Sequence, residues 1–115
     1  MRLTSEFWVS ALIRRCFAEN AYAGLIARGA TEAGAIYIVV DRLDGRFDLY
    51  GPAPQSFFGD TSGGERLFEP LLSLADREAV DARLASDRRM DPDVWIVEVE
   101  DREGRVFWNV AASGD

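Results

Sequence analysis

Hydrophobic residues recur with a helical period near the start of the chain. Between residues 5 and 20 they fall on one broad face of a predicted helix, which Thr4 or Ser5 can cap at its N-terminus. Arg15 and Glu19 stand one helical turn apart in this segment and are expected to form an i, i+4 ion pair. The residues of the apolar face are Trp8, Val9, Leu12, Ile13, Cys16 and Phe17.

A second helix is predicted from about Asp76 to Arg89. Pro92 disfavours helical backbone at Asp91, so this helix is expected to end at or before Met90. Its apolar face is narrower than that of the first helix, and its polar face carries two i, i+4 pairs of opposite charge. The apolar residues are Val80 and Leu84, and the pairs are Arg77–Asp81 and Arg83–Asp87.

Between and after the helices, shorter segments have the pattern of strands. The first three, at Tyr22–Arg28, Ala35–Val40 and Phe47–Tyr50, are expected to form a meander, with Asp44-Gly45 as a two-residue hairpin turn. The segment Ala35–Val40 is apolar on both faces, which is typical of a central strand covered on each side or lying in a subunit contact. A fourth strand is predicted at Glu65–Leu72, where Pro70 indicates an edge position.

The strand Val94–Glu100 follows the second helix directly. From Trp95 to Val99 apolar and acidic residues alternate, so one face is expected to meet water and Trp95 to lie in the core with Val97 and Val99. Val106–Trp108 is expected to return as a short strand beside Val97 and Val99. The pattern predicts one α+β domain spanning residues 1–115. It consists of a mainly antiparallel sheet of four to six strands with two helices packed on one face.

Composition narrows the range of functions. The net charge of −7 and the pI near 4.6 oppose binding to nucleic acid or to anionic lipid. All 13 basic residues are arginine, and the absence of histidine and lysine removes imidazole bases, Schiff-base lysines and the P-loop lysine. Cys16 is the single cysteine and is expected to be a buried hydrophobic residue. No apolar run reaches the roughly 20 residues of a membrane span, and a cytoplasmic protein is expected.

Residues 51–64 form the longest irregular stretch, which is either a lid or binding loop or a surface excursion. Phe57-Phe58 in its middle is expected to fold back onto the core. The segment Gly59–Gly64 is similar to the sequence around trypsin-like nucleophiles, but a threonine is inserted and the chain lacks the required histidine.

Acidic residues gather after the second helix. Asp91 and Asp93, together with Glu98 and Glu100 on one strand face, offer oxygen ligands for Mg²⁺ or Ca²⁺. The order of these residues resembles the PD-(D/E)xK nucleases, although Glu100 replaces the lysine. A metal-dependent hydrolase is therefore one hypothesis. The alternative is that these carboxylates pair with neighbouring arginines on a solvated strand.

Two arginines precede the first of these acidic residues, and we call residues 88–93 the corner. Arg88 and Arg89 either complement the helix dipole and pair with nearby carboxylates or form a docking patch for an acidic partner. The hypothesis of a docking patch takes its binding residues from the corner and from the first helix, and it assigns no catalytic residue, metal or cofactor. These residues are Arg14, Arg15, Arg88, Arg89, Asp91 and Asp93.

Three stretches together resemble a bacterial family, domain of unknown function 1491: Glu6–Val9 with Arg14-Arg15, then Arg88–Trp95, then Val97–Arg105. The resemblance covers nearly the whole chain and implies a single cytoplasmic domain, with no reaction, cofactor or site residue to carry over. We therefore predict a non-enzymatic protein-interaction or regulatory module, with a homodimer as a further expectation because Ala35–Val40 needs cover on its second face. The alternatives are the metal-dependent hydrolase and a small-ligand binder with residues 51–64 as its lid.

Overall fold

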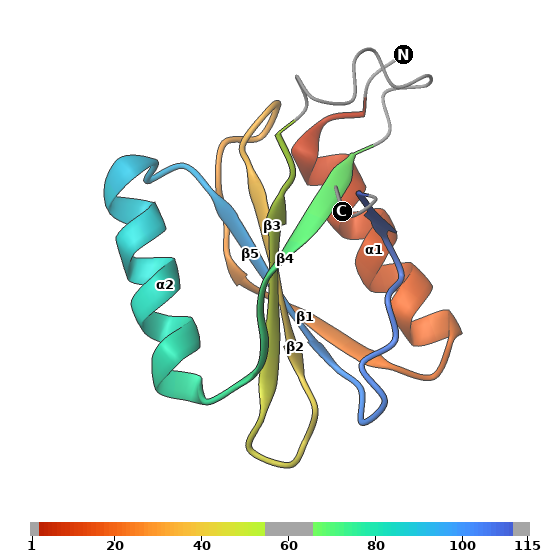
Figure 1. The fold of residues 1–115 in the computed structure, drawn as a ribbon. Coiled ribbons are helices and arrows are strands. Elements are labelled where there is room, and N and C mark those ends of the chain that lie inside the picture. The colour runs from red at the N-terminus through yellow and green to blue at the C-terminus, as the bar shows by residue number, and fades with distance from the viewer. Residues whose placement is uncertain (1–2, 55–65, 112–115) are drawn as a thin grey trace.

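The computed structural model describes residues 3–54 and 66–111, and it shows a six-stranded sheet between two helices (Figure 1). A long helix at the N-terminus precedes the first four strands, and the second long helix lies between the fourth and fifth strands. In chain order the elements are α1 (Ser5–Ala18), β1 (Tyr22–Ala27), β2 (Ile36–Asp41), β3 (Phe47–Pro52), β4 (Leu67–Ala75), α2 (Arg77–Met90), β5 (Trp95–Glu100) and β6 (Asn109–Val110).

The sheet is mixed, with the strand order β1-β5-β2-β3-β4-β6. β1–β5, β2–β3 and β3–β4 are antiparallel, whereas β2–β5 and β4–β6 are parallel. The expectations of a mainly antiparallel sheet and of a meander through the first three strands are therefore wrong. The physical reason is the crossover through α2, which carries the chain past β3 and β2 and inserts β5 between β1 and β2.

The two helices cover opposite faces of the sheet, so the expectation of both on one face is also wrong (Figure 1). The residues of β2 show the arrangement, because Ile38 packs in one core with Leu12 of α1 while Val39 packs in the other with Val80 of α2. β2 is thus a central strand covered on both sides, as its doubly apolar sequence indicates. Its second face is occupied by α2, which removes the reason for expecting a dimer at that strand.

α1 begins as the sequence predicts, because Thr4 caps it by accepting a hydrogen bond from the backbone N–H of Phe7 at 3.1 Å. Cys16 is buried in the core, as expected. Phe17 is 52% exposed and contacts Tyr22 edge-on instead of entering the core. The Arg15–Glu19 ion pair is not formed between these two described residues.

α2 also follows its prediction closely. Asp76 caps it, and the helix ends at Met90 with Asp91 in extended backbone before Pro92. Both predicted ion pairs on its polar face are present, Arg77–Asp81 and Arg83–Asp87. Within the described ranges 3–54 and 66–111, neither helix combines the length and the apolar character that a membrane crossing requires.

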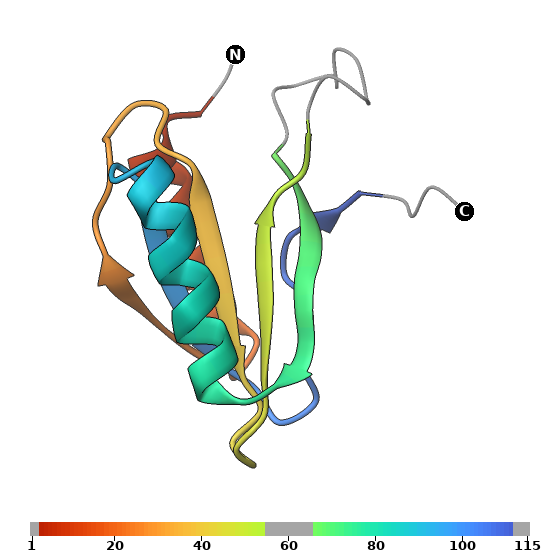
Figure 2. The same cartoon turned by 60° about the vertical axis from the view of Figure 1, so that its left-hand side comes forward.

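The remaining connections combine confirmed and corrected predictions. The β2–β3 hairpin is confirmed, but its loop spans residues 42–46, with positive φ at Leu43 and Gly45, and is wider than a two-residue turn. Pro70 lies on β4 beyond the two residues that β6 pairs with, where no other described strand reaches, so it sits at an edge. The predicted strand at Val106–Trp108 is wrong. Phe107 and Trp108 pack in the core under α1. β6 follows them and pairs with β4 at the edge of the sheet opposite β1 (Figure 2).

Candidate functional site

The corner after α2 combines two exposed arginines with an exposed hydrophobic side chain. Met90 is 87% exposed, and Arg88 and Arg89 beside it are exposed as well. Neither arginine forms an ion pair with any residue in the described part of the chain, although Arg77 and Arg83 of the same helix each hold a carboxylate. The carboxylate pairing that would make Arg88 and Arg89 ordinary surface residues is thus not present.

The backbone of this corner is clamped by the connection between β1 and β2. Ala30 donates its N–H to the Asp93 carbonyl at 2.9 Å, and the Trp95 indole N–H donates to the Ala30 carbonyl at 2.7 Å. Asp91 accepts a hydrogen bond from the backbone N–H of Asp93 at 3.1 Å, which fixes the turn around Pro92. These hydrogen bonds tie the backbone of the corner to the β1–β2 connection, and the exposed side chains project from it.

A groove runs beside the corner, between α2 and β1. Its volume is about 200 Å³, its apolar lining includes Ile26, Leu84 and Ile96, and Arg88 lies along it. We call this the α2 groove; its lining residues are Ile26, Val39, Arg77, Asp81, Leu84, Ala85, Arg88, Ile96 and Glu98. Ile26 is 58% exposed at a β-bulge, where β1 shifts register against β5.

β1 is also an edge strand, with β5 on one side and no described strand on the other (Figure 2). An open edge presents backbone N–H and C=O groups that can pair with another chain. Tyr22 and Leu25 on this strand are half exposed, and the strand carries no charged residue. The open edge, the α2 groove and the corner thus adjoin one another on one side of the molecule.

The acidic residues assemble differently from the hydrolase hypothesis. Glu98 and Glu100 share a face of β5, as predicted, but the third carboxylate near them is Asp41 of β2, with oxygen atoms of all three within 4.8 Å of one another. Asp91 and Asp93 lie before the other end of β5 and are outside this cluster. Arg77 binds Glu98 at 3.1 Å, which is the arginine pairing expected of a solvated strand.

The most perturbed titratable groups in the described residues point to structure and not to reactivity. Burial raises the pKa of the Cys16 thiol to about 11, so little reactive thiolate exists at neutral pH. Burial, together with the hydrogen bond that it donates to Asp87 at 2.8 Å, raises the pKa of Tyr37 to about 12. The Arg105 guanidinium beside Asp101 lowers the pKa of that carboxyl, which in turn accepts hydrogen bonds that close the 101–105 turn.

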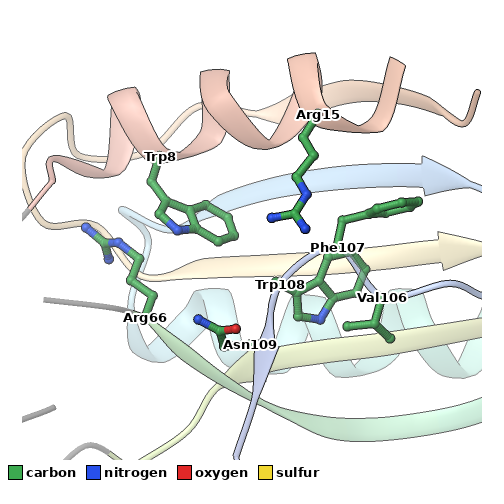
Figure 3. A pocket seen from close by; sticks show the side chains of 7 residues that line it. All are labelled: Trp8, Arg15, Arg66, Val106, Phe107, Trp108 and Asn109. Carbon is green, nitrogen blue, oxygen red and sulfur yellow. The ribbon is translucent and has the colours of Figure 1, made fainter. Parts of the chain in front are cut away.

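A second concave site lies on the other side of the sheet, between α1 and the segment before β6 (Figure 3). It is a cavity of about 340 Å³ whose lining includes Arg15. We call it the α1 cavity; it is lined by Trp8, Arg15, Arg66, Val106, Phe107, Trp108 and Asn109.

Comparison with known proteins settles the family. The family model described as "Protein of unknown function (DUF1491)" matches residues 3–109. The chain belongs to the DUF1491 family. The solution structure of protein Atu0922 from A. tumefaciens is 44% identical, with a TM-score of 0.85 and coverage of 100% of this chain and 99% of that one. A search of curated proteins gives no match.

Two structures of a DUF1491 family protein from Caulobacter crescentus CB15 agree with this assignment. The crystal structure is 32% identical with a TM-score of 0.76, covering 97% of this chain and 100% of that chain. The NMR structure is 34% identical with a TM-score of 0.75, covering 97% and 99%. The resemblance noted from the sequence is confirmed, and this DUF1491 protein shares its fold and family with bacterial relatives.

The structure of this DUF1491 protein separates the six predicted binding residues into two sites. Arg88, Arg89, Asp91 and Asp93 lie together at the corner, whereas Arg14 and Arg15 belong to the helix on the opposite face. Arg15 lines the α1 cavity, and Arg14 is exposed outside it. The suggested lid, with Phe57-Phe58, lies mostly outside the described residues.

Sequence reasoning missed most of the α1 cavity. Trp8, Phe107 and Trp108 have the pattern of core residues, and nothing in their spacing places Asn109 opposite Arg15. Because Glu19 was the expected partner of Arg15, the sequence carried no signal that this arginine lines a cavity.

Proposed function

We propose that this DUF1491 protein is a non-enzymatic interaction module that binds an acidic partner protein at the corner and the α2 groove. The observation that carries the proposal is the state of Arg88 and Arg89. They stand without carboxylate partners among the described residues, next to the 87% exposed side chain of Met90. Cations flanking an exposed apolar residue are the composition expected of an interface with a complementary acidic surface.

The shape of the neighbouring surface supports an extended partner segment. The outer edge of β1 offers backbone hydrogen bonds to an added strand, and the α2 groove beside it offers apolar contact at Ile26 and Leu84. The bulge at Ile26 interrupts the regular register of β1 against β5, and Ile26 lines the groove. We infer a partner strand that pairs with β1 and places an apolar side chain in the groove and carboxylates near Arg88 and Arg89.

The complementary charge also favours a different protein over a second copy of this chain. A partner strand should carry acidic residues, whereas β1 carries none. A two-fold homodimer through two β1 edges is therefore the competing arrangement, and oligomeric state distinguishes it. A cytoplasmic partner, without nucleic acid or membrane, is part of the proposal.

The test uses the purified chain as bait in a cytoplasmic extract of the bacterium that makes it. The bait Arg88→Glu/Arg89→Glu reverses the two corner charges, and the control Arg14→Glu/Arg102→Glu makes the same charge change at exposed residues elsewhere. A partner that binds the wild type and the control should bind the corner variant at least tenfold more weakly, about 1.4 kcal/mol.

Two further measurements make the test decisive. Ile26→Asp should weaken binding of the same partner, because the bound partner would bury the new charge in the groove. Leu43→Asp in the β2–β3 loop should leave binding unchanged. Light scattering of the free chain should give a monomer. Identical partner sets from wild type and corner variant would contradict the proposal. A dimer that the corner variant dissociates would identify a second copy as the occupant.

A further inference from the structure

The α1 cavity has the charge of an anion site in an otherwise acidic protein. The chain carries a net charge of −7, with 20 Asp and Glu residues, yet no carboxylate of residues 3–54 or 66–111 lines this cavity, whereas Arg15 and Arg66 do. Arg66 is held in place by donating to the Leu3 carbonyl at 3.0 Å. Arg15 makes no ion pair with any residue within ranges 3–54 and 66–111, and Glu19 does not reach it. A guanidinium that lies beside a cavity and makes no ion pair with the described residues is available to bind a carboxylate with two hydrogen bonds.

The side chains around Arg15 are fixed in position. Figure 3 shows the Arg15 guanidinium extending from α1 toward Phe107 and Trp108, with Trp8 on its other side and the Asn109 amide below. Trp8 packs against Phe68 with ring centroids 5.2 Å apart, so its indole is anchored in the sheet. Arg15 is exposed to solvent, so its guanidinium is accessible to an anion that enters the cavity between these aromatic rings.

Trp108 adds an independent observation. It lines the cavity, is 8% exposed, and its Nε1 is a buried donor without an acceptor among the described residues. A buried donor left in this state costs free energy, and native proteins usually provide an acceptor. A ligand with carboxylate oxygens matches a cavity wall whose charged groups, among the described residues, are both guanidinium donors.

A smaller apolar cavity continues from the first. Its volume is about 170 Å³, and it shares Trp8, Arg15 and Phe107 with the α1 cavity. Its other lining residues are Leu3, Ala11 and Leu12, which carry no polar side-chain atom. Arg15 thus stands at the junction of a polar and an apolar compartment. Their combined size lies within the range of small-molecule sites.

We propose that this pair of cavities binds a small monocarboxylate with an apolar body. The carboxylate pairs with Arg15 in the larger cavity, and the apolar body occupies the smaller cavity against Leu12 and Phe107. Inorganic anions lack the apolar part, and neutral apolar molecules leave Arg15 without a partner. The site is on the opposite face of the sheet from the corner, so it is independent of the proposed partner surface.

The test is an NMR titration of the ¹⁵N-labelled chain with four probes, read at the three tryptophan indole N–H signals. The probes are 1-naphthoate, its neutral isostere 1-naphthamide, acetate and inorganic phosphate. The indoles of Trp8 and Trp108 line the site, while Trp95 is bonded to Ala30 outside it and is the internal control. Naphthoate should shift the Trp8 and Trp108 signals saturably, with half-saturation below about 1 mM, and leave Trp95 unmoved.

The comparison among probes decides the outcome without any variant. Naphthamide, acetate and phosphate should each bind at least tenfold more weakly than naphthoate. Naphthamide binding as well as naphthoate would show that charge is irrelevant, and acetate or phosphate binding equally well would show that the apolar compartment is irrelevant. Either result overturns the proposal, as does the absence of saturable naphthoate binding.

A pair of variants then assigns the anion to Arg15. Arg15→Gln should weaken naphthoate binding at least tenfold, whereas Arg14→Gln, the adjacent exposed arginine outside the cavity, should leave it within twofold. An unchanged Trp95 signal verifies that each variant is folded. Equal losses in the two variants would show a general charge effect and contradict the assignment.

Discussion

Gly29 is the residue at which a single methyl group should disturb the corner most. A Cβ atom placed there would meet the carbonyl oxygen of Asp93, the backbone carbon of Val94 at 2.6 Å and Cδ1 of Trp95 at 2.8 Å. Two of these three atoms belong to the backbone and cannot move independently. The change Gly29→Ala therefore forces apart the connection that hydrogen-bonds the corner through Ala30.

The expected cost follows from overpacking. Inserting a methyl group into a site without room typically costs 1–3 kcal/mol, and weakening the two hydrogen bonds of Ala30 places Gly29→Ala near the upper end, at about 3 kcal/mol. For a chain of 115 residues, this corresponds to a melting temperature lowered by about 12 °C.

The assay is equilibrium unfolding followed by tryptophan fluorescence, with Gly24→Ala as the matched control. At Gly24 a Cβ would make only ordinary contact, 3.5 Å from the hydroxyl oxygen of Tyr22. This variant should stay within about 1 kcal/mol of the wild type, because alanine also restricts the unfolded chain. Equal losses at Gly24 and Gly29 would refute the claim that the 29–34 connection clamps the corner.

Two further predictions concern stability. Asp48 is 4% exposed, binds Arg42 at 2.7 Å and accepts the backbone N–H of Leu74 at 2.9 Å, so Asp48→Ala should cost about 3 kcal/mol, against less than about 1 kcal/mol for the exposed Asp81→Ala, by urea unfolding. The Cys16 thiol has a pKa of about 11 in the folded chain against 9.0 as its ordinary value. Between about pH 9 and 11 the folded state thus binds more protons than the unfolded state, and stability should fall as pH rises by up to about 1.4 kcal/mol per pH unit. Cys16→Ala should lessen this slope between pH 9 and 10; an unchanged slope would contradict the assignment to Cys16.

The parts of the fold that local chemistry determines were predictable from the sequence. The end of α2 at Met90 follows from Pro92 and its effect on the preceding residue, and the burial of Trp95 follows from the period of its strand. The central position of β2 follows from its doubly apolar sequence. Each of these features depends on neighbours within a few positions of the chain.

The pairing of strands was not predictable in the same way. Whether β5 lies beside β1 or elsewhere depends on the path of α2 over the sheet, and no residue of β5 encodes its neighbour. The prediction that both helices share a face failed for the same reason. The candidate sites were unpredictable for the same reason. Arg88 and Ile26 line one groove, and Arg15 and Trp108 line one cavity, only because the strands take this order.

The most direct test of the proposed function is amide hydrogen exchange of the captured complex compared with the free chain. We predict new protection along residues 22–27 of β1 and around residues 84–90 of α2, with no change at residues 8–17 of α1. Protection at residues 8–17 while exchange in β1 stays as fast as in the free chain would contradict it, and would place the partner on the opposite face of the sheet.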